Sequence, residues 1–292
     1  MLAVIDRSAP VLSVDHPGRV AVLRLLNRAS ARVEADGPDE LLRTLNTIDD
    51  PGATVLTVGR LSTLTAALSS FCTRRSAESW PAFAHMGGLA ADDAHGQIGF
   101  TDDIVQRCAA LERALQAATS RKVPLLRVEA TDIAHIRLGF QAASGAAIPV
   151  VRAAQSEGAL RERLGGAAQV VRQLAASRHD GLGDTTVELD GLVIDAPDYW
   201  LLGSRNIRLG RVTLGDAERE GLTAMAGRVD EIRTLLSPTT WLKGTGFKRQ
   251  TRVAQVASVR TEAPWMLDGW LHVPESMAAV RVLSGGSVAL VA

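Results

Sequence analysis

The spacing of apolar and polar residues predicts a strand, a helix and a second strand near the start of the chain. Apolar runs at residues 11–14 and 20–25 lie on either side of a Pro-Gly corner and predict a β-hairpin. Residues 39–48 repeat apolar positions at helical spacing behind an acidic first turn. Residues 53–58 then predict a buried strand that ends at Gly59. This order favours a crossover unit with a parallel sheet.

The middle of the chain alternates between irregular and periodic stretches. Residues 62–99 are rich in Gly and polar residues without a clear period, which predicts a surface loop. Thr101 is a suitable N-cap for a helix over residues 101–119, and residues 123–128 predict the strand that follows it. Further elements are expected as a helix at 157–177, a strand at 185–195 and a helix at 216–236.

The pattern of apolar residues changes in the last part of the chain, because short β-type runs replace the helical periods. We therefore expect a boundary near Ser237, with an α/β core over residues 1–236 and a β-rich segment over residues 237–292. That segment contains Trp241, Trp265, Trp270 and Met266, which indicate an oligomer interface or the cap of a small β core. The short strands are expected at residues 252–261, 270–273, 280–283 and 287–291.

Composition narrows the range of partners and environments. The 292 residues are 46% hydrophobic, which is enough for a large core, and the 32 basic and 32 acidic residues cancel. A neutral chain with scattered basic residues binds nucleic acid poorly, so no nucleic-acid partner is expected. No apolar stretch is long enough to cross a bilayer and the start does not look like a secretory signal, so we expect no membrane association and a cytoplasmic location.

Cysteine and histidine positions predict no metal and no disulfide. Cys72 and Cys108 stand outside any metal-binding spacing, and two cysteines cannot form a disulfide framework in a chain of this length. His85 and His95 flank a Gly- and Asp-rich loop that could recruit a metal, although loop histidines are commonly solvated. We therefore expect no metal site.

Three segments resemble the crotonase (enoyl-CoA hydratase/isomerase) superfamily. Residues 11–59 look like its opening hairpin, helix and glycine-ended strand, and residues 124–128 resemble its next, proline-led strand. Residues 193–210, VIDAPDYWLLGSRNIRLG, are similar to its Ala-Pro-acid corner and Arg-Leu-Gly turn. The resemblance implies an α/β fold with a crotonase-like ββα spiral core and a lyase, isomerase or hydrolase of acyl thioesters. It also implies coenzyme A thioesters as substrates, no other cofactor, and a homo-oligomer, either a trimer or a hexamer.

The resemblance also implies where the acyl thioester would bind. Backbone N–H groups in that family hold the thioester oxygen as it becomes an enolate. The matching positions here lie after Gly59, near Phe71, and after the proline-led strand, at Ala130 and His135. They lack the family's glycine-rich pattern. Two further candidates, Arg74 and Arg75, could contact the phosphates of coenzyme A or could be solvated surface charges.

Acid–base residues form the second implied group. The family's carboxylate before the Arg-Leu-Gly turn is replaced here by Asn206, which cannot exchange a proton near neutral pH. Asp195, Asp198 and Glu188 are the remaining candidates, although a strand end with several acids is more often a solvated edge. The alternatives to an enzyme are a crotonase-like pseudoenzyme with a protein partner and a structural subunit of a larger assembly.

One geometric expectation tests the resemblance. If it is correct, the strands at residues 20–25, 53–58 and 123–128 lie side by side in one sheet. Gly59 and Glu129 should then meet at one rim, where a ligand crevice is expected.

Overall fold

The chain forms two compact units. The computed structural model describes residues 1–87, 104–148, 151, 182–204, 207–209, 212–214, 221–228 and 252–291. Unit 1 comprises Met1–Leu125 and Gly286–Ala292, and unit 2 comprises Leu126–Gly285. The boundary predicted near Ser237 lies outside the described residues, as does the helix predicted at 157–177. No helix in the described parts is long and apolar enough to cross a membrane.

Unit 1 is built on a parallel sheet with the strand order β2-β1-β3-β4-β18. Its pairs β1–β2, β1–β3, β3–β4 and β4–β18 are all parallel. After β1 the chain moves to one side of that strand and returns to the other side for β3, so the order reverses between β1 and β3. The strands are β1 (Leu2–Asp6), β2 (Ala31–Ala35), β3 (Thr54–Val58), β4 (Ala82–Met86) and the end of β18 (Ala278–Val291).

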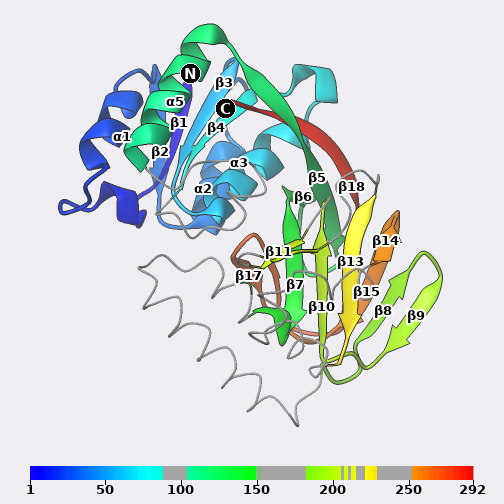
Figure 1. The fold of residues 1–292 in the computed structure, drawn as a ribbon. Coiled ribbons are helices and arrows are strands. Elements are labelled where there is room, and N and C mark those ends of the chain that lie inside the picture. Colours follow the sequence, from blue (N-terminus) through cyan, green and yellow to red (C-terminus); the bar gives the residue numbers. More distant parts are fainter. Residues whose placement is uncertain are drawn as a thin grey trace. The chain divides into compact units, whose positions relative to one another are not determined.

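Helices cover both faces of this sheet (Figure 1). On one face α1 (Arg19–Leu26) and α5 (Ile104–Ala117) enclose an apolar cluster with the alternate residues Ala3, Ile5 and Leu56 of the strands. On the other face α2 (Pro38–Leu45) and α3 (Leu61–Cys72) pack against each other and the strands. Every residue of α3 is buried, which makes it the central helix of the unit. Two short 3-10 helices complete the unit, η1 (Pro10–Leu12) and η2 (Ala77–Ser79).

The predicted elements of unit 1 are only partly correct. The helix α2, the strand β3 and the helix α5 form where they were predicted. The predicted hairpin is wrong, because residues 19–26 form α1 and bury Val22, Leu25 and Leu26 at helical spacing. The predicted loop over 62–99 is also wrong, because Leu61–Cys72 is the buried helix α3 and Ala82–Met86 is the strand β4; residues 88–99 lie outside the described residues. Small residues such as Ser62, Ala66 and Ser69 stand between its leucines and Phe71 and let that helix pack on all sides.

Unit 2 is a sandwich of antiparallel sheets. One sheet has the strand order β14-β13-β10-β7-β16-β17, and it packs on β5, β8, β15 and the start of β18. Trp200, Leu202 and Trp265 from the first sheet enclose a core with Val187 and Val259 from the second. The strands are β5 (Ser120–Ala130), β6 (Arg137–Gly139), β7 (Gln141–Gly145), β8 (Thr186–Leu189), β9 (Leu192–Asp195), β10 (Tyr199–Gly203), β11 (Ile207–Leu209), β12 (Val212–Leu214), β13 (Leu222–Gly227), β14 (Arg252–Ala254), β15 (Val256–Thr261), β16 (Trp265–Leu267) and β17 (Trp270–His272).

In unit 2 the structure differs from three of the predictions. The strand predicted at 185–195 is a hairpin, β8 and β9, because Asp190 and Gly191 adopt positive φ angles of 47° and 88° and form a tight turn. Residues 222–227 form the strand β13 inside a predicted helix. The two strands predicted at the end of the chain are one continuous strand, β18.

Trp265, Trp270 and His272 form an aromatic cluster at the edge of the six-stranded sheet. The His272 ring stacks on Trp265 with a centroid separation of 4.1 Å. The Arg137 guanidinium lies 4.6 Å from the centroid of the Trp270 ring. Burial, followed by the nearby Arg137 charge, lowers the pKa of His272 to about 4. The fold therefore holds this imidazole in its neutral form.

Acidification should consequently destabilise the folded chain. The folded-state pKa of His272 lies below the ordinary 6.5, so its stabilising contribution is present above that pH and is lost as the pH falls. We expect His272 to account for a loss of about 2 kcal/mol in the free energy of unfolding between about pH 7 and about pH 5. Urea unfolding of the wild type and of His272→Phe at both pH values measures it. An equal pH dependence in the two proteins would contradict this assignment.

Candidate functional site

The candidate site of unit 1 lies at the carboxyl ends of β1 and β3. The strand order reverses between these two strands, and ligands of open α/β sheets bind outside the strand ends at such a point. β1 ends at Asp6, and β3 runs into Gly59 and Arg60 before α3 begins at Leu61. The candidate site is therefore formed by two turns, the one after β1 and the one after β3.

The turn after β3 brings the backbone unusually close to its neighbours. Gly59 has a φ of 152°, and a Cβ added there would lie 2.4 Å from the Thr63 Oγ1 and 2.8 Å from the Asp6 Cβ. The Gly59 N–H donates to the Met86 carbonyl at 2.9 Å, which ties the turn to β4. Only glycine leaves enough room for β1, β3 and α3 to converge here.

The N-terminus of α3 carries donors that are suited to an anion. Arg60 is the N-cap residue and provides no side-chain cap hydrogen bond, and its own side chain is exposed. The Thr63 hydroxyl is buried beside Gly59 and has no hydrogen-bond partner among the described residues. N–H groups at the start of a helix, together with the positive end of its dipole, favour negatively charged groups. The turn thus combines an uncapped helix start with an unsatisfied hydroxyl.

Asp6 supplies the carboxylate at the end of β1. It is only 2% exposed, and its Oδ1 accepts hydrogen bonds from the Ser8 N–H at 2.9 Å and from the Ser8 hydroxyl at 2.7 Å. These two bonds fix the turn after β1 next to Gly59.

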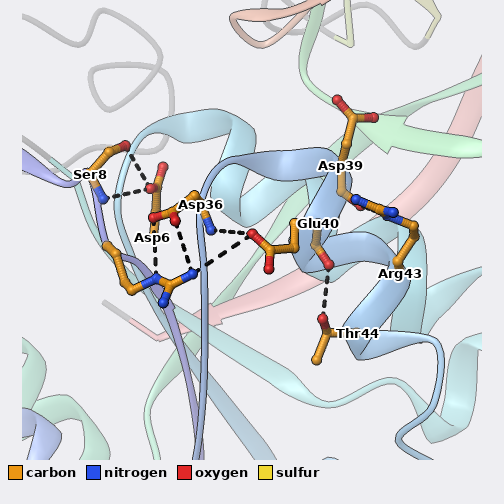
Figure 2. A network of polar contacts seen from close by, with 8 residues as sticks. Asp6, Ser8, Asp36, Asp39, Glu40, Arg43 and Thr44 are labelled. Atoms are coloured by element: carbon orange, nitrogen blue, oxygen red, sulfur yellow. Dashed lines mark hydrogen bonds and ion pairs between the residues drawn. The ribbon is translucent and has the colours of Figure 1, made fainter.

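A charged network continues from this turn to α2 (Figure 2). The Arg7 guanidinium lies 2.9 Å from the Asp36 carboxylate and 3.9 Å from that of Glu40. Glu40 also accepts the Asp36 N–H at 2.8 Å, so a side chain of α2 caps the end of β2. All three side chains are well exposed, and such pairs contribute little to stability. The network leaves Arg7 neutralised and orients the loop between β2 and α2.

His85 lies on β4, at the same level as Thr57 on β3. Its Nδ1 is 2.8 Å from the Thr57 hydroxyl. Burial, followed by the Arg107 charge, lowers the pKa of His85 to about 3. The expectation of a loop histidine beside a possible metal is therefore corrected, because His85 is a buried, neutral strand residue; His95 lies outside the described residues.

Comparison with known proteins identifies the fold. No protein-family model matches the chain, and no curated protein matches it in sequence. A diacylglycerol kinase from Bacillus anthracis strain Sterne superposes with a TM-score of 0.62 and 12% identity, over 99% of this chain and 95% of that chain. The chain shares its fold. Two further structures from that strain also superpose on this chain, and their assignment as diacylglycerol kinases is provisional. Both give a TM-score of 0.64 and cover 99% of this chain. One is 12% identical and is covered over 95% of its length, and the other is 11% identical and is covered over 96%.

These matches overturn the crotonase interpretation. The coarse prediction of a mixed α/β protein is confirmed, but the crotonase-like spiral is replaced by a parallel-rich sheet and an antiparallel sheet. The predicted neighbours are also wrong, because β3 pairs with β1 and β4 whereas β5 pairs with β18 and β6. Gly59 falls in unit 1 and Glu129 in unit 2, so the two residues do not belong to one compact sheet domain as the resemblance required. The acyl-thioester function and the lyase, isomerase and hydrolase activities lose their basis together with the fold.

The expected ligand-binding residues fall in different units. Gly59, Phe71, Arg74 and Arg75 belong to unit 1, whereas Ala130 and His135 belong to unit 2. Phe71 is fully buried in α3. Ala130 ends β5, and His135 is exposed in the following loop, where its carbonyl accepts from Arg137 Nη1 at 3.3 Å. Of these residues, Gly59 alone lies at the candidate site.

The expected acid–base residues lie in or next to the β8–β9 hairpin of unit 2. Glu188 and Asp195 are exposed on β8 and β9. The Asp198 carboxylate lies 3.7 Å from Arg228, and its backbone N–H donates to the Gly227 carbonyl at 2.8 Å. Asn206 lies outside the described residues. The sequence argument overlooked Asp6 and Thr63, although a strand ending in Gly before a helix could have indicated the second of them.

Arg74 joins the ends of two helices in this structure. Its guanidinium donates to the carbonyls of Leu45 and Ile48 at 3.2 Å and of Asn46 at 3.0 Å, at the end of α2. Its Nε donates to the Ser70 carbonyl at 2.8 Å. Carbonyls at a helix end have no partner inside the helix, and a cation there is stabilising.

Replacement of Arg74 should therefore affect stability. We expect Arg74→Met to lower the free energy of unfolding by about 1 kcal/mol, because the exposed side chain gives up several modest hydrogen bonds. Thermal and urea unfolding measure the change, with the exposed Arg43→Met as the control in α2. An Arg74→Met protein as stable as the control would show that these contacts are dispensable.

Proposed function

We propose that the turn from Gly59 to Thr63 binds the phosphates of ATP and that the chain is an ATP-dependent kinase. The observation that carries the proposal is the glycine-ended strand β3, which leads into the uncapped N-terminus of the buried helix α3 beside the unsatisfied Thr63 hydroxyl. Phosphate groups bind at helix starts of this kind. The position at the strand-order reversal supports the same ligand class.

The kinase part of the proposal is supported by the fold. The diacylglycerol kinase structure matches 99% of this chain, so both units have counterparts in it. A kinase needs an acceptor hydroxyl, and diacylglycerol is the first acceptor to test because it is named for that protein. In the described residues no group of three or more His, Cys, Asp or Glu side chains could hold a metal ion.

The test separates binding from phosphoryl transfer. Isothermal titration of the full chain with magnesium-ATP should give saturable one-to-one binding. A second assay follows phosphate transfer from ATP to diacylglycerol in detergent micelles. Binding without transfer to diacylglycerol or other lipid alcohols would contradict a lipid kinase activity, and the absence of binding would contradict the whole proposal.

A further inference from the structure

The outer strand of the β8–β9 hairpin has an open edge. β9 ends the strand order β18-β15-β8-β9, and in the described part of the chain it pairs with β8 alone. Figure 1 shows this hairpin at the end of its sheet. Val193 is 53% exposed and Leu192 is 40% exposed. Exposed apolar residues on a free edge favour pairing with another strand.

The hydrogen-bond pattern shows which backbone groups point outward. Asp190 and Gly191 form a two-residue turn, so Leu189 and Leu192 are a hydrogen-bonded pair. The Ala196 N–H donates to the Thr185 carbonyl at 2.9 Å, which confirms that every second pair bonds across the hairpin. Val193 lies between such pairs, opposite Glu188, and its N–H and C=O therefore point away from β8. The same holds for Asp195, opposite Thr186.

β9 has only part of the protection that free edges commonly carry, because it is short and carries one charge, Asp195. Its four residues, Leu192, Val193, Ile194 and Asp195, include no lysine, no proline and no bulge. Ile194 packs against the core of the sandwich, and Leu192 faces the same side because it opposes Leu189. A strand added at this edge would thus extend the apolar face of the sheet.

We propose that the chain forms a two-fold symmetric dimer in which β9 pairs antiparallel with β9 of a second copy. With Val193 opposite Val193 of the second copy, their outward N–H and C=O groups bond to each other. Leu192 then meets Ile194 of the other copy, so apolar side chains cover each other on the core side. Asp195 faces the turn glycine Gly191 and no like charge. The strand is therefore self-complementary, as an isologous interface requires.

Three variants of one residue test this dimer. Val193→Pro removes the outward N–H but no hydrogen bond to β8, because Val193 does not bond across the hairpin. Val193→Lys keeps the N–H and places two like charges opposite each other. Val193→Thr keeps both the N–H and the β-branched shape, and serves as the matched control.

Light scattering coupled to gel filtration gives the readout at low and high micromolar concentrations. The wild type and Val193→Thr should approach twice the single-chain mass of 31.0 kDa at high concentration, whereas Val193→Pro and Val193→Lys should remain single chains. Circular dichroism and melting curves check that each variant is folded, and Val193→Lys decides the matter if Val193→Pro does not fold. A monomeric wild type, a larger assembly, or a dimer that persists in Val193→Lys would overturn the proposal.

Discussion

Gly59→Ala should lower the free energy of unfolding of unit 1 far more than an ordinary glycine substitution does. The new Cβ would lie 2.4 Å from the Thr63 Oγ1 and 2.8 Å from the Asp6 Cβ, at a φ of 152° that side chains rarely adopt. Overpacking and backbone strain each cost up to a few kcal/mol, so we expect a loss of about 3 kcal/mol in the free energy of unfolding. The same displacement would move the start of α3, and ATP binding should be lost as well.

The control for this variant is Gly52→Ala in the same unit. Gly52 also has a positive φ, 75°, but nothing lies within 4 Å of an added Cβ. Only the backbone cost of about 1 kcal/mol is then expected. Urea unfolding of both variants measures the difference, and equal losses would show that the convergence of β1, β3 and α3 at Gly59 is not tight.

Asp268→Ala should have a comparable effect in unit 2. Asp268 is 1% exposed, and its two carboxylate oxygens accept the Phe140 N–H at 2.8 Å and the Gln141 N–H at 2.9 Å. These bonds link the turn between β16 and β17 to the start of β7. Alanine would leave two buried N–H groups without this acceptor, at a cost of about 3 kcal/mol in the free energy of unfolding.

Two further variants isolate the cause of that loss. Asp268 has a φ of 50°, a conformation that asparagine tolerates and alanine does not. Asp268→Asn keeps one acceptor oxygen and should lose less than Asp268→Ala. The exposed Asp184→Ala should change stability little. If Asp268→Asn were as unstable as Asp268→Ala, the second oxygen would carry the whole effect and this account of shared acceptors would fail.

Local patterns predicted elements where one face of the element is solvated. The helix α2 buries Leu41, Leu42 and Leu45 and exposes Arg43 and Thr44, so its period is visible in the sequence. The helix α3 is buried on every side, with small and polar residues such as Ser69 and Ser70 packed inside, and it shows no such period. Fully enclosed elements cannot be recognised by amphipathic spacing.

The candidate site could not be derived from the sequence because it depends on strand order. Asp6 and Thr63 are far apart along the chain, and both lie beside Gly59 because β1 and β3 are neighbours. The crotonase interpretation placed β3 beside β5, and that choice moved the expected site to residues in two separate units. A correctly predicted strand therefore gave an incorrect site once its neighbours were wrong.

Titration of magnesium-ATP into the wild type and into Thr63→Val tests the central claim most directly. The Thr63 hydroxyl is buried without a partner, so valine should leave the free energy of unfolding unchanged or raise it by about 1 kcal/mol. If that hydroxyl is held ready for a phosphate, Thr63→Val should weaken ATP binding about tenfold, while Thr44→Val, on the exposed side of α2, should bind as the wild type does. Equal ATP affinity in all three proteins, or no affinity in any of them, would contradict the account.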